Sequence, residues 1–355
     1  MANKTARLGD LATYINGYAF KPADWGDTGL PIIRIQDLTG NSYQLNRYDG
    51  EYPERIEVND GDVLISWSAS LGVYVWQRGK ALLNQHIFKV VFDKLPVNKD
   101  YFVFAVEHKL AEMESKTHGA TMKHIVKKDF DGTTIPYPPI EKQAEIADHL
   151  RRITSLIDRQ TEQLLLLDQL VKSRFIELFG DPVINPKGFP CYTVGEVIDF
   201  QGGSQPDKKY FEYEALPGNI RLIQIRDYKS DKYITYIPKT MAKRFCTADD
   251  IMIGRYGPPI FQILKGIEGS FNVALMKATP KMGNREFVRQ FLKQDCLLEY
   301  LEGLSKRTAG QDGIQMDKLK AYPFPYPPME LQEQFAAFVE QTDKSKLCGK
   351  MEVAA

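Results

Sequence analysis

Two stretches of the chain show short apolar runs separated by turn residues. The runs are rich in Ile, Val, Phe and Tyr and are punctuated by Gly, Pro and Asn-Asp, a pattern typical of β-strands joined by tight turns. In the first stretch the predicted strands cover residues 31–35, 63–66, 72–77 and 87–92. A helix over 99–113 follows them, with a counterpart over 285–304, because apolar residues fall on one helical face. Each stretch therefore predicts an α/β (α+β) globule.

A long amphipathic pattern separates the two stretches, over residues 141–179. Its apolar residues recur in steps of four and three, a heptad stripe that Gln160 and Arg174 interrupt. The pattern ends at Gly180-Asp-Pro182, where glycine and proline stop a helix. Such a helix is about 60 Å long at about 1.5 Å per residue. The stripe favours a coiled-coil partner, and the alternative is a helix that lies along one of the globules.

The chain also repeats itself. Pro136-Tyr-Pro-Pro139 returns as Pro325-Tyr-Pro-Pro328, and each copy precedes a helical pattern. Further pairs keep the same order along the chain: 8–11 with 194–197, 32–38 with 222–228, and 59–65 with 248–253. Two globule-plus-helix units are therefore predicted, with a pseudo-twofold relation if the helices pair antiparallel. The predicted segments are 1–140, 141–182, 183–329 and 330–355.

The second helix loses its apolar register soon after it begins. Thr342 and Lys346 stand where the first helix has Ile153 and Ile157, so we expect the second helix to be short or frayed. The first helix would then lack a full partner within the chain, and an exposed apolar stripe normally marks an interface. The residues expected to form the helix interface are Ile146, Leu150, Ile153, Ile157, Leu164, Leu167, Val171, Leu178, Phe335 and Val339.

Composition and charge exclude several classes of protein for this chain. The chain has 355 residues, and its 43% hydrophobic content excludes a mostly disordered protein. With 46 Lys+Arg against 46 Asp+Glu it does not coat nucleic acid by bulk charge, although residues 190–329 carry 20 basic and 16 acidic side chains. No apolar run approaches the roughly 20 residues of a membrane helix, and the first residues lack an apolar signal core, so a cytoplasmic location is expected.

No catalytic or metal motif stands out. The four cysteines are about fifty residues apart with no Cys-x-x-Cys pair, which argues against zinc or redox chemistry. Tyr137-Pro-Pro139 has the wrong order for the Asn/Asp-Pro-Pro-Tyr/Phe motif of an adenine methyltransferase, and no ATP-binding Gly-x-x-x-x-Gly-Lys motif occurs. Glu114-Ser-Lys116 fits half of a nuclease site, but so short a pattern arises by chance. We expect no catalytic centre in this chain.

The order of these segments resembles the DNA specificity (S) subunit of type I restriction–modification systems. The matching residues are 136–143, 174–182 and 325–332, and the resemblance spans essentially the whole chain. It implies two tandem target recognition domains with mixed sheets, separated by long coiled-coil-forming helices. Each domain would read one half of a split double-stranded DNA site, and the chain itself would be non-catalytic.

The resemblance also implies partners. The helices would dock N6-adenine methyltransferase (M) subunits, which would hold S-adenosylmethionine, and these would recruit restriction (R) subunits that use ATP and Mg. No cofactor is expected in this chain. Because the second helix is short, we expect either an M subunit or a second copy of the chain to cover the stripe of the first helix.

Base readout needs donors and acceptors on firmly held loops, and phosphate contacts need Lys, Arg and hydroxyls. Three loops per globule fit, at 16–21, 66–71 and 116–128 and at 201–209, 254–262 and 305–314. The candidate DNA contacts in the first globule are Tyr18, Lys21, Trp67, Ser68, Ser70, Lys116, Thr117, His118, Thr121, Lys123, His124 and Lys127. Those in the second are Gln201, Ser204, Gln205, Lys208, Arg255, Tyr256, Lys306, Arg307 and Gln311. Arg255 suits guanine, and Gln201, Gln205 or Gln311 suits adenine.

Two other interpretations remain open at this point. One is a protein-only scaffold whose two globules bind proteins, and the other is a complete enzyme with an unfamiliar active site. DNA binding in the presence of the partner subunit separates the first from the favoured interpretation. Activity of the purified chain with S-adenosylmethionine or magnesium would support the second, and we expect none.

Overall fold

The computed structural model describes residues 4–41, 45–116, 127–256, 259–305 and 313–354, with the backbone alone at 114–116, 305 and 348–354. The chain forms two compact units, Met1–Ile157 and Asp158–Ala355. The helix α5 (Ile140–Phe179) contributes its first part to one unit and its second part to the other.

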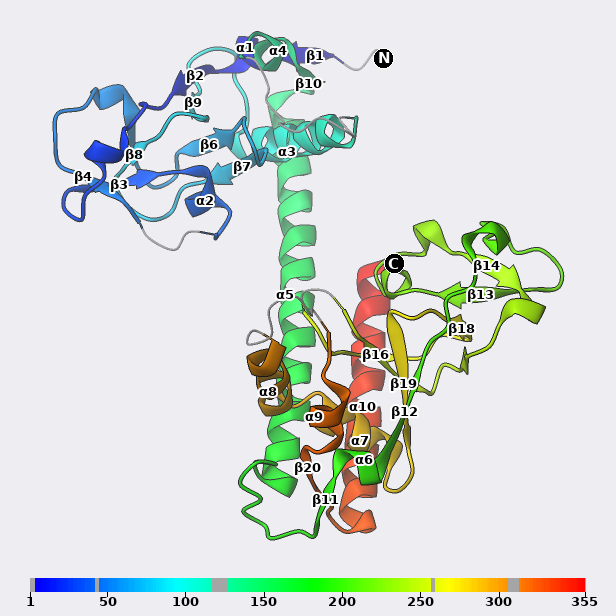
Figure 1. Ribbon diagram of the computed structural model, residues 1–355. Helices are drawn as coiled ribbons and strands as arrows, with labels where there is room; N and C mark the ends of the chain where they lie inside the picture. Colours follow the sequence, from blue (N-terminus) through cyan, green and yellow to red (C-terminus); the bar gives the residue numbers. More distant parts are fainter. Residues whose placement is uncertain (1–3, 42–44, 117–126, 257–258, 306–312, 355) are drawn as a thin grey trace. The chain divides into compact units, whose positions relative to one another are not determined.

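Among its described residues the first unit contains two four-stranded sheets and one two-stranded pair, and most of these strands are labelled in Figure 1. The strand orders are β2-β9-β6-β7, which is antiparallel throughout, and β4-β3-β8-β5, in which β3 and β8 run parallel. The strands are β1 (Thr5–Arg7), β2 (Thr13–Asn16), β3 (Leu30–Ile33), β4 (Arg47–Tyr48), β5 (Glu57–Val58), β6 (Val63–Ser66), β7 (Gly72–Val75), β8 (Ala81–Leu83), β9 (Ile87–Val91) and β10 (Thr134–Pro136). The helices are α1 (Leu8–Leu11), α2 (Ile35–Leu38), α3 (Lys99–Lys116) and α4 (Lys127–Gly132).

The second unit repeats this topology strand for strand. Its sheets are β12-β19-β16-β17 and β14-β13-β18-β15, in which β13 and β18 run parallel, and β11 pairs with β20 as β1 pairs with β10. The strands are β11 (Cys191–Thr193), β12 (Ile198–Gly202), β13 (Asn219–Ile223), β14 (Tyr236–Pro238), β15 (Phe245–Cys246), β16 (Ile251–Gly254), β17 (Gln262–Lys265), β18 (Gly269–Phe271), β19 (Leu275–Pro280) and β20 (Pro323–Pro325). The helices are α6 (Val194–Val197), α7 (Arg285–Leu292), α8 (Asp295–Ser305), α9 (Met316–Lys320) and α10 (Met329–Ala354). The predicted duplication is confirmed as a duplication of fold.

The predicted helix over 285–304 is wrong in one respect, because it is two helices, α7 and α8. The break has a local cause at Gln294, whose side chain donates to the Gln290 carbonyl at 2.9 Å. That carbonyl would accept the Gln294 backbone N–H in a continuous helix, but it receives the Lys293 N–H instead, at 3.2 Å. A side chain that competes for a backbone acceptor stops the helix here.

A buried glutamine fixes the start of each long helix to its own domain. Gln143 accepts the Asn98 N–H at 2.9 Å, and Gln332 accepts the Asn284 N–H at 2.8 Å. Each side chain also donates to the first carbonyl of its Pro-Pro pair, at 2.8 and 2.7 Å respectively. The repeated Pro-Pro-x-Glu-x-Gln motif is therefore the joint between globule and helix.

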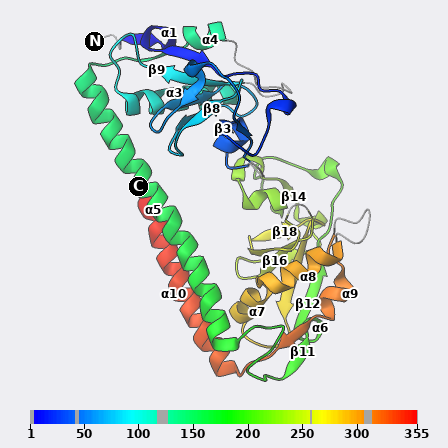
Figure 2. The same ribbon diagram turned by 90° about the vertical axis from the view of Figure 1, so that its left-hand side faces the viewer.

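In the second unit, α10 runs antiparallel to the C-terminal part of α5 (Figure 2). The Phe335 ring of α10 meets Phe175 and Phe179 of α5 at 5.5 and 5.4 Å. The same two rings pack on Phe287 of α7, at 5.7 and 4.8 Å, so the helix pair shares one core with the second domain. Both interpretations of the long helix thus hold for this part of α5, which pairs with α10 and also lies on a globule. The helix α10 is shorter than α5, as expected, but it continues to Ala354 beyond the point where its apolar register fails.

Candidate functional site

Three connections meet at one end of the antiparallel sheet in each domain. In the first domain Ser66 lies opposite Ile87, and Asn16 lies opposite Phe88, so β2 and β6 end where β9 begins. In the second domain the equivalent pairs join β12 and β16 to the start of β19. We call this end the strand-end face and define it by residues 17–21, 67–71 and 84–86 in the first domain and 203–209, 255–256, 259–261 and 272–274 in the second.

A close backbone approach fixes each strand-end face. Gly17 lies against the carbonyl of Asn84, and Gly203 lies against that of Asn272, so a Cβ at either glycine would overlap the carbonyl. The hydrogen bonds match as well, because the Gly17 N–H donates to Ile87 at 3.2 Å and the Gly203 N–H to Leu275 at 3.1 Å. Both domains therefore hold these connections on the same rigid backbone, which is what positioned binding loops require.

The candidate DNA contacts of the first domain lie on this face, and they differ in how exposed and how tightly packed their side chains are. Tyr18 is 43% exposed and packs edge-on against Phe20. Trp67 is half-buried and stacks on Phe88 at 5.5 Å, so one of its ring faces belongs to the core. The Ser66 hydroxyl donates a hydrogen bond of 2.5 Å to the Ser70 backbone carbonyl, which closes the turn over residues 66–70. Ser68 and Lys21 also lie in these connections, and Lys21 is exposed.

In the second domain Arg255 and Tyr256 lie together, with the guanidinium 5.3 Å from the centre of the tyrosine ring. Tyr256 is 47% exposed. Gln201 belongs to β12 and pairs with Lys277 in the sheet, so its backbone is a strand and not a loop as predicted. The remaining candidates are partly or fully exposed and follow that strand, at Ser204, Gln205 and Lys208.

Part of the predicted basic loop is helix. Lys127 is the first residue of α4 and forms an ion pair with Asp131 at 3.5 Å, because the two residues lie one turn apart. Lys116 ends α3, and only its backbone is described. The other predicted contacts of these loops lie outside the described residues, namely Thr117, His118, Thr121, Lys123, His124, Lys306, Arg307 and Gln311.

The sequence interpretation missed a basic region in the second domain. Residues 207–244, which include the strands β13 and β14, carry nine Lys or Arg and five Asp or Glu side chains. This difference equals the whole basic excess of residues 190–329. The signal was available as a local count, and Lys208 was the only residue of this region among the candidates. Such a region suits contacts with phosphates.

The predicted helix interface is partly buried and partly exposed. Val171, Phe335 and Val339 are buried in the second core, and the half-buried predicted positions are Ile146, Leu150, Leu164, Leu167 and Leu178. Ile153 and Ile157 are 52% and 45% exposed, so their place in a helix interface stays a prediction that needs another chain. The prediction also missed Phe175 and Phe179, which are fully buried or nearly so.

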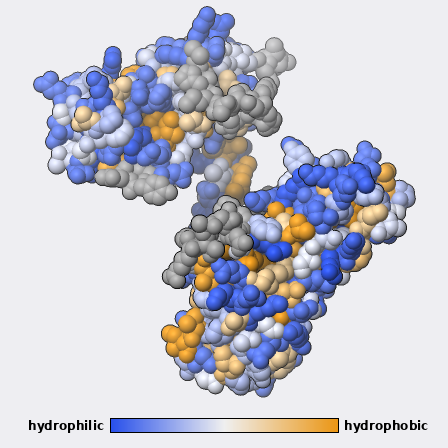
Figure 3. All heavy atoms as spheres, viewed as in Figure 1, coloured by the Kyte–Doolittle hydropathy of each residue, from blue (hydrophilic) through white to orange (hydrophobic). Residues whose placement is uncertain are grey.

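Further apolar side chains of α5 face outward. Leu165, Leu166 and Leu170 are each about half exposed or more, at 60%, 54% and 48%. Figure 3 shows further apolar side chains, in orange, on the stretch of α5 that precedes these leucines. Exposed leucines in series on one helix are typical of a surface that another protein covers.

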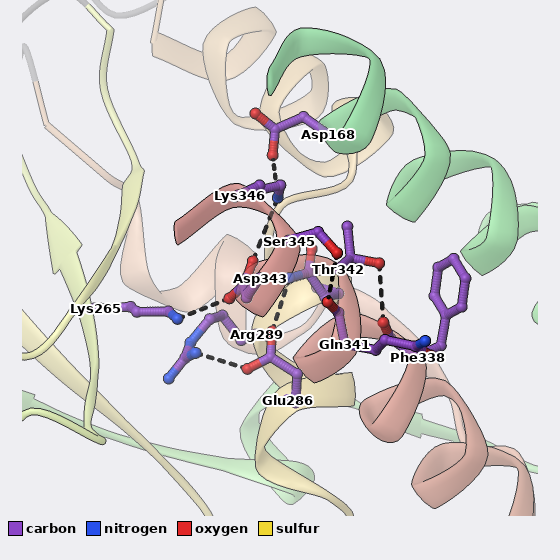
Figure 4. Close-up of polar contacts among 11 residues, drawn as sticks. Asp168, Lys265, Glu286, Arg289, Phe338, Gln341, Thr342, Asp343, Ser345 and Lys346 are labelled. Carbon is purple, nitrogen blue, oxygen red and sulfur yellow. Dashed lines mark hydrogen bonds and ion pairs between the residues drawn. The ribbon is translucent and has the colours of Figure 1, made fainter. Parts of the chain in front are cut away.

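An ion-pair chain ties α10 to its surroundings (Figure 4). Lys346 contacts Asp168 of α5 at 2.6 Å and Asp343 of its own helix at 3.3 Å, and Asp343 in turn accepts from Lys265 of β17 at 2.8 Å. Burial alone would raise the pKa of Asp343, but Lys265 and Lys346 together lower it below its usual value. These residues border a cavity of about 1320 Å³ lined by seven basic and six acidic side chains, and we assign it a structural role.

Two other classes of site find no support in the part of the chain that the structure describes. No group of three or more His, Cys, Asp or Glu side chains is placed to hold a metal ion among the described residues. None of the described helices combines the length and the apolar character needed to cross a membrane.

Comparisons with known proteins identify the family. A family model described as type I restriction modification DNA specificity domain matches residues 2–167 and 186–349. The MjaVIII type I restriction enzyme specificity subunit of Methanocaldococcus jannaschii is 24% identical over 373 residues, covering 96% of this chain and 86% of that protein. The EcoBI specificity subunit of Escherichia coli is 29% identical over 168 residues, covering 46% of this chain and 35% of that protein.

Comparison with solved structures supports the fold. The crystal structure of a type I restriction–modification S subunit from M. genitalium superposes with a TM-score of 0.57 at 16% identity, covering 99% of this chain and 92% of that one. The relatives are specificity subunits by name, which agrees with the expectation of a non-catalytic chain. Since both copies of the repeat match the family model, the chain belongs to the type I restriction modification DNA specificity domain family and carries that domain twice.

Proposed function

We propose that the chain reads a bipartite DNA target, one half with each domain, as the specificity subunit of a type I restriction–modification complex. The observation that carries the proposal is the duplicated strand-end face, which has one backbone design and different exposed side chains in the two domains. Sequence-specific recognition requires donors and acceptors on firmly held segments, and two such faces suit two half-sites. The basic region at 207–244 would add phosphate contacts.

The exposed leucines of α5 are the proposed docking surface for methyltransferase subunits. In this arrangement the M subunits hold S-adenosylmethionine and perform N6-adenine methylation, and the R subunits use ATP and Mg. This chain then supplies sequence choice alone. A neutral chain suits such a division, because its partners would supply much of the positive charge that grips DNA.

DNA binding tests the first part of the proposal. The chain is purified with its methyltransferase subunit, and binding to labelled genomic fragments is measured by gel shift at several salt concentrations, with random DNA as competitor. We expect a subset of fragments to resist competition by about a thousandfold or more, the usual margin of specific over non-specific binding. Equal competition by all fragments, from a folded complex, would favour the protein-only scaffold.

Substitutions on α5 test the docking surface. Leu166→Glu and Leu170→Glu place a charge on the exposed leucines, and we expect them to abolish copurification with the methyltransferase subunit. Gln169→Glu is the matched control, because it adds the same charge at an exposed polar position of the same helix. Light scattering of the chain alone shows whether a second copy covers this surface instead. Unchanged copurification of the leucine variants would refute the proposed surface.

A further inference from the structure

The two strand-end faces correspond residue by residue. The Trp67 N–H donates to the His86 carbonyl at 3.3 Å, and the Arg255 N–H donates to the Ala274 carbonyl at 2.9 Å. Likewise the Tyr18 N–H donates to Leu83 at 2.8 Å, and the Ser204 N–H donates to Phe271 at 3.1 Å. The matched positions are therefore Tyr18 with Ser204, Trp67 with Arg255, Gln85 with Val273, and His86 with Ala274.

Each face carries one side chain at these positions that ends in a two-point hydrogen-bonding group. In the first domain it is Gln85, which is half-buried and whose side-chain amide makes no hydrogen bond to another described residue. In the second it is Arg255, whose guanidinium contacts the Tyr256 ring and has no hydrogen-bond partner among the described residues. The partner positions, Trp67 and Val273, are apolar and cannot offer such a group.

Backbone strain marks the same places. Among the described non-glycine residues with positive φ, Ala69 at 60° and His86 at 75° lie on the first strand-end face, and Phe261 at 58° lies on the second. Such conformations cost energy and persist where the surrounding structure enforces them, which is common at binding sites. The backbone is fixed on both sides of Gln85, by the close approach of Gly17 to Asn84 and by the positive φ of His86. The Gln85 side chain therefore leaves a rigid backbone.

We propose that Gln85 and Arg255 are the base-reading residues of the two half-sites, Gln85 for an adenine and Arg255 for a guanine. The assignment follows from geometry, because a glutamine amide matches N6 and N7 of adenine, and a guanidinium matches O6 and N7 of guanine. It deepens the proposed function and rests on it. It also places the two readers at non-equivalent positions, so the half-sites differ although the backbones are alike.

The test is sequencing of modified bases in cells that express the chain with its methyltransferase subunit. The variants are Gln85→Ala and Arg255→Ala, and the controls are Gln77→Ala, beyond the other end of β7, and Arg285→Ala, at the start of α7. We expect each variant to relax one position of one half-site by about 5- to 150-fold while the other half stays unchanged. Both controls should keep the wild-type motif.

Isosteric variants keep the test decisive if an alanine variant does not fold. Gln85→Glu is expected to move the preference at its position from adenine to cytosine, since a carboxylate accepts from cytosine N4. Arg255→Lys is expected to keep guanine with a weaker preference. An unchanged motif in the Gln85 or Arg255 variants would overturn the inference. A wild-type complex that methylates no bipartite motif would instead overturn the proposed function, so the two failures are distinguishable.

Discussion

The buried side chain of Gln332 accepts a hydrogen bond of 2.8 Å from the Asn284 N–H, which joins α10 to the start of α7. Gln143 and Asn98 form the same bond in the first unit, at 2.9 Å. In both cases the amide also satisfies a proline carbonyl, so a single side chain closes the turn before the helix and fixes the helix to its domain. One glutamine therefore ties the start of each long helix to its own domain.

We predict that Gln332→Ala destabilises the chain by about 1–3 kcal/mol, because it removes a buried side chain and leaves the Asn284 N–H without its acceptor. Gln334→Ala, at an exposed position of the same helix, should change the free energy of unfolding by about 0.5 kcal/mol at most. Urea denaturation followed by circular dichroism measures both. Equal effects of the two substitutions would contradict the role given to Gln332.

Gly203→Ala should destabilise the second domain by about 1–3 kcal/mol, because the new Cβ overlaps the Asn272 carbonyl and the backbone must shift. Gly303→Ala is the matched control, since a Cβ there meets no atom within 4 Å and alanine favours a helix. Thermal unfolding should therefore show a lower Tm for the first variant and an unchanged or higher Tm for the second. A neutral Gly203→Ala would refute the close approach.

The aromatic contact between α5 and α10 should dominate their pairing. Phe335→Ala removes a fully buried ring that meets Phe175 and Phe179, and we expect a loss of about 3–5 kcal/mol. Phe338→Ala, which removes a partly buried ring of the same helix, should cost clearly less. Denaturant titration of both variants provides the comparison, and a larger cost for Phe338→Ala would show that the helices pair differently.

The ion-pair chain predicts a modest acid sensitivity. Since the pKa of Asp343 is lowered in the folded chain, its contribution is present above the pKa of the unfolded aspartate, about 4, and is lost as the pH falls further. Asp343→Asn should therefore reduce stability at pH 7 by less than about 1 kcal/mol, as is usual for partly exposed pairs, and should make no difference near pH 2. Glu162→Gln, at an exposed position of α5 outside the cavity beside the ion-pair chain, is the control in the same pH series.

Much of the fold follows from the sequence, because both strand alternation and the repeat are local signals. Val63–Ser66 is predicted to the residue, and the end of α5 coincides with its Gly-Asp-Pro stop. The break at Gln294 could not be read from periodicity, since it depends on a side chain that competes for a backbone carbonyl. Phe175 and Phe179 were not predicted, because the heptad pattern selects residues that face a partner helix. These two rings also pack in the core of the second domain.

The candidate site was predictable only in part. Two of the three connections on each strand-end face were expected from their turn and polar residues. The third, at 84–86 and 272–274, was missed, although Asn84 and Asn272 are separated by 188 residues, nearly the same separation as the 186 residues between Gly17 and Gly203. This connection reaches the strand-end face because β3 pairs in parallel with β8, and β13 with β18. Such a pairing joins segments far apart in the sequence, so no local pattern predicts it.

The central claim is that this chain chooses a two-part DNA sequence for a methyltransferase that does the chemistry. Its most direct test is co-expression with the methyltransferase subunit in a host that lacks adenine methylation, followed by genome-wide sequencing of modified bases. The account predicts methylated adenines within one motif made of two short specified halves and an unspecified spacer of constant length. A continuous motif, or unmodified DNA in cells that contain the folded complex, would contradict it.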